Sequence, residues 1–419
     1  MNYLLKMKKN IEISSVQTAN YTYDLPEDRI AYEALEKRDE SRLMVVYKEE
    51  FLHTYYKELP SVLPPTSHLV FNNTKVISAR LHFANKNNRV IEIFLLEPVD
   101  GNYAALHNKQ RSVWKCMIGG AKKWKAEETL VKPILAEEPS YLLEATLLEK
   151  KDDCYVVSFK WQNSMTFYEV IEKSGRTPLP PYIKREATSN DALRYQTVFA
   201  KEEGSVAAPT AGLHFTEELL QRLNSEGVGS SQLTLHVGAG TFKPVTAESI
   251  ADHIMHKEFF EVPVETLQTL SNKDLRIIPV GTTSLRTLES LYWMGLKIYL
   301  QKCTLQSLNL LEQWEHVELS QLPLPDYRIV FNCLIEELHR EKKSSFHGHT
   351  GICITPGYSF KVAKGLITNF HQPQSTLLLI IAAILGDRWK SMYETALEYP
   401  YRFLSYGDGS LLFIEEESA

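Results

Sequence analysis

The residue pattern of this 419-residue chain changes near residue 165, and that change limits the folds available to it. Between residues 80 and 160, short apolar runs alternate with polar turns and show little helical periodicity. Clear examples are Arg89–Leu96, Tyr141–Leu148 and Cys154–Trp161. Polar residues at Lys150–Asp153 separate the last two runs as a hairpin turn would. Several short strands joined by polar turns predict a small β-barrel.

After residue 165 the chain repeats strand, loop and helix. In the clearest unit, Ile277–Val280 reads as a strand and Leu285–Tyr292 as an amphipathic helix, which we expect to end at Gly295. The sequence therefore predicts an α/β main domain interrupted by an inserted small β-barrel domain. We place the discontinuous α/β domain at residues 1–79 and 165–419, and the barrel at residues 80–164.

The loop of that unit carries Gly281, Thr282, Thr283 and Ser284 directly before the helix. Backbone N–H groups and hydroxyls at such a position suit an anion or a ligand carboxylate. The loop has neither a Walker nor a GxGxxG pattern, and an ordinary capped helix explains the segment equally well.

Histidines recur beside turns. His214 ends a run of small residues, Val206–Phe215, and is followed by the helix start Thr216–Glu218. His236 lies between a strand pattern and a glycine turn, and His256 lies in a segment rich in proton-carrying groups. Each could be a packed histidine, but together they indicate chemistry. No HExxH pattern is present, and we expect no metal.

Two segments near the end frame an apolar helix, Leu377–Leu385, which is too short to span a bilayer. Thr368–Pro373, with His371, precedes it, and Tyr401–Gly409 follows it. The second segment mixes aromatic rings, a guanidinium and a carboxylate around glycines, as a nucleoside or cationic ligand requires. Packing and turn formation account for such a mixture equally well.

The formal net charge of −6 argues against a protein that is basic throughout, although local lysine clusters permit contact with RNA. The five cysteines form no CxxC pair, as expected of reduced thiols in a cytosol. Residues Met1–Lys9 lack the apolar core of a signal peptide. We therefore expect a cytoplasmic protein without a membrane role.

Taken together, these segments resemble the S-adenosylmethionine:tRNA ribosyltransferase-isomerase family of queuosine biosynthesis. The resemblance covers nearly the whole chain, and each segment alone would be weak. The matching stretches, in order, are Tyr23–Pro26, Arg38–Leu43, Phe71–Ile77, Gly175–Ile183, Tyr195–Phe199, the segments around His214, His236 and His256, Gly281–Ser290, Pro356–Tyr358, Gly365–Thr376 and Tyr401–Asp408.

The resemblance implies an α/β domain interrupted by a barrel, in agreement with the change near residue 165. It also implies transfer of the ribosyl moiety of S-adenosylmethionine to the 7-aminomethyl-7-deazaguanine wobble base of tRNA. The product is epoxyqueuosine, and adenine and methionine are released. S-adenosylmethionine is a consumed co-substrate, and no cofactor is implied. The expected partner is a tRNA anticodon loop, and we expect a monomer.

That reaction needs a base, an acid and groups that hold each substrate. The histidines that can carry protons are His214, His236, His256 and His371. Carboxylates that can offset the sulfonium charge are Glu258, Glu289 and Asp408, and hydroxyls that can hold the methionine carboxylate are those of Thr282, Thr283 and Ser284. Rings that can stack on the base are Tyr182, Phe215 and Tyr406, and candidate phosphate contacts are Arg185, Arg194 and Arg402.

The chain also departs from the family pattern. The departures are Tyr32, Ala34, Lys75, Ser78, Gly351, Cys353 and Thr355, with longer segments near residues 102–125 and 301–349. Two alternatives therefore stay open: a non-catalytic tRNA-binding paralogue, and a paralogous enzyme that uses S-adenosylmethionine on a different amine.

Overall fold

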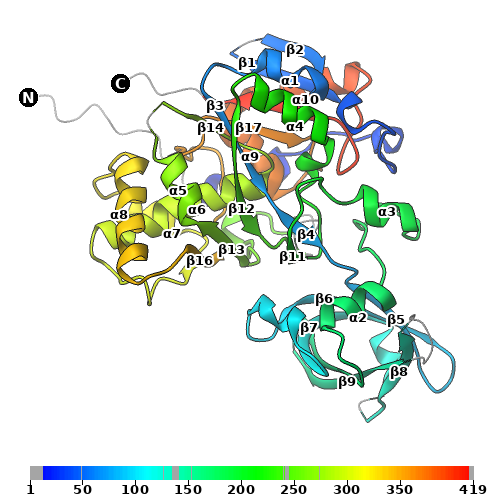
Figure 1. The fold of residues 1–419 in the computed structure, drawn as a ribbon. Coiled ribbons are helices and arrows are strands. Elements are labelled where there is room, and N and C mark those ends of the chain that lie inside the picture. The colour runs from blue at the N-terminus through cyan, green and yellow to red at the C-terminus, as the bar shows by residue number, and fades with distance from the viewer. Residues whose placement is uncertain are drawn as a thin grey trace, which may run out of the picture. The chain divides into compact units, whose positions relative to one another are not determined.

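The computed structural model describes residues 13–48, 50–125, 127–134, 141–151, 153–238, 240, 245–272 and 274–414. They form two compact units (Figure 1). The α/β unit comprises the described residues among Met1–Asn73, Pro209–Leu235 and Lys243–Ala419. The barrel unit comprises those among Thr74–Ala208 and His236–Phe242. Residues 239 and 241–244, in the glycine turn expected after His236, and the Met1–Lys9 stretch lie outside the described residues.

The barrel unit holds a closed antiparallel barrel in the strand order β10-β7-β6-β5-β8-β9. Its strands are β5 (Arg80–Ala84), β6 (Val90–Pro98), β7 (Arg111–Gly119), β8 (Leu130–Ile134), β9 (Tyr141–Lys150) and β10 (Tyr155–Trp161). The predicted hairpin is confirmed, because β9 pairs antiparallel with β10. Alternate residues face inward, among them Trp114 and Phe159, which are fully buried.

The barrel unit also contains short helices and strands outside the barrel. They are β4 (Thr74–Val76), α2 (Phe167–Ser174), α3 (Ser189–Arg194) and β11 (Glu202–Ser205), with β4 and β11 parallel. Thr166 caps α2 with a capping box completed by Glu169, which explains why the helical pattern starts just after residue 165. The compact unit is thus wider than the segment 80–164 expected for the insertion, and the barrel strands themselves lie between Arg80 and Trp161.

The α/β unit is built on a mixed sheet. Its strands are β1 (Arg42–Tyr47), β2 (Glu50–Tyr55), β3 (Ser67–Asn72), β12 (Gly229–Leu235), β13 (Glu258–Pro263), β14 (Arg276–Pro279), β15 (Leu310–Leu311), β16 (Ser345–Thr350), β17 (Gly365–Asn369) and β18 (Gly409–Phe413). They lie in the orders β17-β18-β1-β2 and β14-β3-β12-β13-β16-β15. A parallel bridge between Val280 and Ile367 joins the two parts. The N–H of Gly281 donates to the carbonyl of Ile367 (2.8 Å) at this junction.

Strand direction brings distant segments to one edge of this sheet. Strands β3, β12 and β14 are mutually parallel, and the bridge makes β17 parallel to β14. Because β18 is antiparallel to β17 and parallel to β1, both β18 and β1 begin where β17 ends. We call this side, where β3, β12, β14 and β17 end, the carboxyl edge. Open α/β sheets bind ligands beyond this edge.

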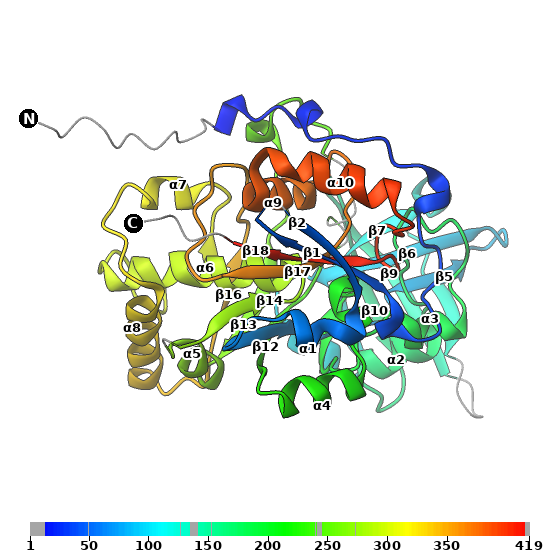
Figure 2. The same cartoon turned by 90° about the horizontal axis from the view of Figure 1, so that it is seen from above.

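The helices of the α/β unit are α1 (Leu59–Val62), α4 (Glu217–Ser225), α5 (Val264–Leu270), α6 (Thr282–Tyr299), α7 (Glu315–Leu319), α8 (Tyr327–Arg340), α9 (Thr376–Leu385) and α10 (Trp389–Glu398). Helices α9 and α10 lie on one side of the strands and α4 on the other (Figure 2). Two predicted helix starts are confirmed, since Thr216 caps α4 and Ser375 caps α9 with side-chain oxygens.

The prediction that the helix after Gly281 stops at Gly295 was wrong, because α6 runs through to Tyr299. A Cβ at Gly295 would lie 2.7 Å from Cγ1 of Val330 on α8. This glycine therefore permits the close approach of α8 instead of ending α6. No helix in the described part of the chain is both long and apolar enough to cross a membrane.

Candidate functional site at the carboxyl edge

His214 lies at the carboxyl edge, at the end of the 3₁₀ helix Thr210–His214, and is 3% exposed. Its Nδ1 lies 2.9 Å from Oγ of Ser41, and its Nε2 lies 3.1 Å from Nδ2 of Asn369. Thr210 donates to Oδ1 of Asn369 (2.8 Å), which turns the amide nitrogen toward the histidine. The network therefore assigns the proton to Nδ1, which donates to Ser41, while Nε2 accepts.

The surroundings of His214 keep its ring neutral. The imidazole stacks on Tyr56, with ring centroids 4.4 Å apart. Burial lowers the pKa of His214 to about 3, and the positive charges of Arg402 and Arg38 act in the same direction. A histidine held this way is a fixed, uncharged donor and acceptor at neutral pH.

His371 follows β17 by two residues and is 7% exposed. Its Nε2 lies 2.9 Å from Oγ1 of Thr368, and its backbone N–H donates to the hydroxyl of Tyr393 (3.0 Å). Burial lowers the pKa of His371 to about 3. Within the described part of the chain, Nδ1 of His371 has no hydrogen-bond partner. His371 thus keeps one ring nitrogen that can exchange a proton, whereas both nitrogens of His214 are engaged.

Asp408 lies just before β18 and is 1% exposed. Its carboxylate accepts from the backbone N–H groups of Arg42 (2.9 Å) and Arg402 (2.7 Å), and the Arg402 guanidinium lies 3.6 Å away. Burial raises the pKa of Asp408, against the effect of these donors. Asp408 therefore fixes the turn that starts at Arg402, and Tyr406 within that turn is 2% exposed.

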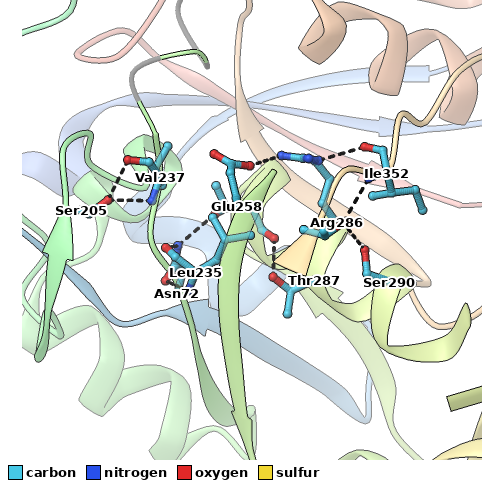
Figure 3. Close-up of polar contacts among 11 residues, drawn as sticks. Asn72, Ser205, Leu235, Val237, Glu258, Arg286, Thr287, Ser290 and Ile352 are labelled. Atoms are coloured by element: carbon cyan, nitrogen blue, oxygen red, sulfur yellow. Dashed lines mark hydrogen bonds and ion pairs between the residues drawn. The ribbon is translucent and has the colours of Figure 1, made fainter. Parts of the chain in front are cut away.

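The first turn of α6 opens onto the same edge. Gly281, with φ +89°, makes the turn from β14 into the helix. Asn72, the last residue of β3, donates to Oγ1 of Thr283 (3.3 Å) and to the carbonyl of Leu235 (2.9 Å), so one side chain ties β3, β12 and α6 together (Figure 3). The hydroxyl of Ser284 donates back to Val280 (3.0 Å).

The backbone N–H groups of this first turn remain available. Within the described residues, those of Thr282, Thr283 and Ser284 have no acceptor. Such groups, together with the helix dipole, carry partial positive charge. An anionic group placed here would meet backbone donors and not the Ser284 hydroxyl, which is engaged with Val280.

A buried ion pair lies farther along the same edge. Nη1 of Arg286, on α6, donates to the carboxylate of Glu258 at the start of β13, and the two side chains point toward one another (Figure 3). Their side chains are 7% and 5% exposed. Nε of Arg286 donates to the carbonyl of Ile352 (3.3 Å), while Nη2 is buried without a hydrogen-bond partner in the described structure.

Glu289, a sequence candidate for offsetting the sulfonium charge, does not reach the carboxyl edge. It is fully buried on α6, and its carboxylate accepts from the backbone of Lys361 (2.8 Å), Val362 (3.0 Å) and Ala363 (3.0 Å) and from the hydroxyl of Tyr358 (2.8 Å). Burial raises its pKa, whereas these donors lower it. Its oxygens are occupied in fastening this loop to α6, and we leave Glu289 out of the substrate-binding set.

Two other candidates in the α/β unit lie elsewhere than expected. His256 is exposed on the segment before β13, two residues after Ile254, which is 83% exposed. Phe215 is fully buried, with its ring 5.0 Å from that of Phe71 and 5.9 Å from that of Tyr56. Its ring is part of the core, so stacking on a substrate base would require the core to open.

His236 belongs to the barrel unit, where its Nδ1 lies 2.8 Å from Oγ1 of Thr74 and its ring 4.1 Å from that of Tyr103. Burial lowers the pKa of His236 to about 3. A Cβ at Gly204 would lie 2.8 Å from the His236 ring, so a glycine is needed for this packing.

The basic candidates of the barrel unit differ in their surroundings. Arg185 forms two hydrogen bonds to the carboxylate of Asp191 (2.7 and 2.8 Å). Burial opposes ionisation of Asp191, yet Arg185 and Thr188 lower its pKa to about 2. Arg185 is thus committed to the start of α3, and, like Arg194 and Tyr182, it is half-buried.

Several residues of this site were not singled out from sequence: Ser41, Tyr56, Asn72, Arg286 and Asn369. The two asparagines each end a strand inside a motif that carried the resemblance. A polar amide at the carboxyl end of a buried strand is a signal that could have found them. Among the described residues, no group of histidine, cysteine, aspartate and glutamate side chains is arranged to hold a metal ion.

The fold and the site define a protein of the α/β class whose polar groups gather at the carboxyl edge of a mixed sheet, with a closed β-barrel in a separate compact unit. A family model described as "Queuosine biosynthesis protein" matches residues 18–412. The chain belongs to this family.

Several proteins similar to this chain share the same name. A protein of Thermotoga maritima named S-adenosylmethionine:tRNA ribosyltransferase-isomerase is 37% identical over 95% of this chain and 100% of its own length. Proteins of that name from Desulfitobacterium hafniense and a Nostoc species are 37% and 34% identical over 94% and 95% of this chain and 98% and 92% of their own lengths. A crystal structure of S-adenosylmethionine tRNA ribosyltransferase from Thermotoga maritima is 28% identical, with a TM-score of 0.44, and covers 93% of this chain and 99% of that one.

Proposed function

We propose that this chain is an S-adenosylmethionine:tRNA ribosyltransferase-isomerase. It transfers the ribosyl moiety of S-adenosylmethionine to the 7-aminomethyl-7-deazaguanine wobble base of tRNA and gives epoxyqueuosine, adenine and methionine. The proposal rests on the similarity of this chain to a relative whose name states that activity. The two sequences are 37% identical over 95% of this chain and the full length of the relative. S-adenosylmethionine is consumed as a co-substrate, and the reaction needs no cofactor.

The carboxyl edge of the α/β unit supplies the groups that this reaction needs. The available N–H groups of Thr282, Thr283 and Ser284 suit the methionine carboxylate, because helix N-termini favour anions. His371 is the group we assign to proton exchange, since its Nδ1 has no partner among the described residues. His214, held on both sides by Ser41 and Asn369, is a positioning group in its neutral form.

The buried carboxylate of Asp408 is our candidate to offset the sulfonium charge, because the Arg402 guanidinium lies beyond hydrogen-bond distance of it, whereas Glu258 is hydrogen-bonded to Arg286. Asp408 already has a cationic neighbour in Arg402, 3.6 Å away, so we assign Arg402 to the site and not to tRNA phosphate. For the anticodon loop we assign the half-buried Arg194 and Tyr182 of the barrel unit. Because these groups come from one chain, we propose that a monomer is active.

The test is incubation of the purified chain with S-adenosylmethionine and tRNA that carries the aminomethyl-deazaguanine, followed by mass spectrometry of the digested nucleosides. Epoxyqueuosine is the expected product, with one adenine released for each nucleoside formed. Binding of this tRNA without any product would favour the non-catalytic paralogue. Adenine release with another amine, but not with this tRNA, would favour the enzyme of altered substrate.

A further inference from the structure

The guanidinium of Arg286 has an unused donor in a buried place. Two of its nitrogens are engaged, by Glu258 and by the carbonyl of Ile352. Its Nη2 has no hydrogen-bond partner among the residues that the structure describes, although the side chain is only 7% exposed. Buried polar atoms are almost always paired in folded proteins. An orphaned donor on a charged group is therefore evidence for a ligand that completes it.

Arg286 lies one helical turn from the start of α6. Side chains of an α-helix lean toward its N-terminus, and residues four apart share a face, so Arg286 leans toward Thr282. Glu258 begins β13 and Ile352 follows β16, and both places lie at the carboxyl edge because β13 is antiparallel to β12 and to β16. Two independent sets of unused donors, the first-turn N–H groups and Nη2, thus lie at the same edge.

The charges there specify the ligand. Arg286 and Glu258 neutralise one another, which leaves the partial positive charge of the helix N-terminus and one guanidinium N–H. This arrangement matches a single carboxylate better than a phosphate dianion. We infer that Nη2 of Arg286 and the first turn of α6 hold the α-carboxylate of S-adenosylmethionine. This inference rests on the proposed function.

Glu258 takes a different role from the one expected from sequence. Its charge is used by Arg286, so it orients the guanidinium and does not face the sulfonium. Removing one partner alone would leave the other buried and unpaired, and the variant could fail to fold. The informative variant therefore changes both, Arg286→Met with Glu258→Gln, because no charge is then left unpaired.

The experiment measures binding by calorimetry to the full chain, without tRNA and without turnover. The ligands are S-adenosylmethionine and its decarboxylated form, which lacks only the α-carboxylate. We expect the wild-type chain to bind the decarboxylated form roughly 10- to 100-fold more weakly. The double variant should lose a similar factor for S-adenosylmethionine and less than about threefold for the decarboxylated form.

A matched control is the exposed pair formed by Arg222 of α4 and Glu226, the residue that follows this helix, joined at 2.8 Å with side chains 45% and 44% exposed. Arg222→Met with Glu226→Gln should change neither affinity. Equal losses for both ligands in the Arg286 and Glu258 variant would overturn the inference and leave the proposed function intact. If the double variant does not melt cooperatively, Arg286→Lys takes its place, with the same two ligands and the same expectation. A wild-type chain that neither binds S-adenosylmethionine nor forms product would overturn both.

Discussion

Asn369 donates from Nδ2 to Nε2 of His214 across 3.1 Å, and thereby joins two residues 155 positions apart in the chain. The hydroxyl of Thr210 holds the amide in this orientation. His214 is therefore a neutral ring with a fixed tautomer, and its place depends on the last residue of β17. The edge of the sheet, and not the loop around His214 alone, determines how this histidine is presented.

Replacing Asn369 by leucine should lower the free energy of unfolding by about 1–3 kcal/mol, because Nε2 of His214 loses its only donor among the described residues. Chemical denaturation measures this value. Asn224, exposed on α4, is the control, and Asn224→Leu should change stability by less than about 0.5 kcal/mol. Equal effects of the two changes would mean that the hydrogen bond contributes nothing specific.

Changing His371 to glutamine should lower single-turnover rates by about 100- to 10,000-fold at saturating tRNA, as expected when a general acid or base is removed. Affinity for tRNA should stay close to that of the wild-type chain. His347, exposed on β16, provides the control change His347→Gln. A rate within threefold of wild type for His371→Gln would remove His371 from the chemistry and return attention to His236.

Stability should fall as the pH is lowered from about 6.5. His214, His236 and His371 have pKa values of about 3 because they are buried, whereas their unfolded values are 6.5. Between these values the unfolded chain binds more protons, so each histidine lowers the free energy of unfolding by up to about 1.4 kcal/mol per pH unit. The raised carboxyl pKa values of Asp408 and Glu289 act in the opposite direction, because as the pH falls the folded chain takes up these protons before the unfolded chain does.

Urea denaturation at several pH values between about 5 and 7 tests this expectation. Replacing His371 by glutamine should flatten the slope by about one histidine, because glutamine does not titrate. A free energy of unfolding that is constant over this range would show that the histidines are accessible to protons in the folded chain.

Changing Glu289 to glutamine should lower stability by about 1.5–3 kcal/mol and leave the affinity for S-adenosylmethionine unchanged. The reason is that an amide nitrogen would face backbone N–H donors that now point at a carboxylate oxygen. Thermal melting and calorimetric binding measure the two quantities. Glu336→Gln, at an exposed position of α8, should alter neither. Weaker binding without loss of stability would restore Glu289 as a substrate group.

Much of the fold could be predicted from local pattern. Alternation and polar turns identified the β9–β10 hairpin, and cap residues identified the starts of α4 and α9. Gly295 was misread because its role is set by Val330, a residue of another helix that the local pattern does not include. The joining of β17 to β14 is also a long-range pairing, and it alone brings the His371 segment to the edge where α6 begins.

The sequence indicated which segments form the site better than it indicated which side chains lie in it. Residue type, with neighbouring glycines for His214 and Asp408 and the following apolar helix for His371, pointed to these three residues, and the structure places all three at the carboxyl edge. The sequence could not distinguish these three residues from Glu289 or Arg185. In the structure, the Glu289 carboxylate accepts hydrogen bonds from Tyr358 and the loop after it, and the Arg185 guanidinium is paired with Asp191. Such pairings depend on which buried partner the fold supplies, and a charge pattern along the chain does not contain that information.

We propose that the reaction centre lies at the carboxyl edge of the α/β unit. The most direct measurement is a crystal structure of the chain with bound S-adenosylmethionine. We expect the methionine carboxylate within hydrogen-bond distance of the first-turn N–H groups of α6 and of Nη2 of Arg286, with the sulfonium on the side of Asp408 and His371. A ligand held inside the barrel formed by β5 to β10 would contradict the account.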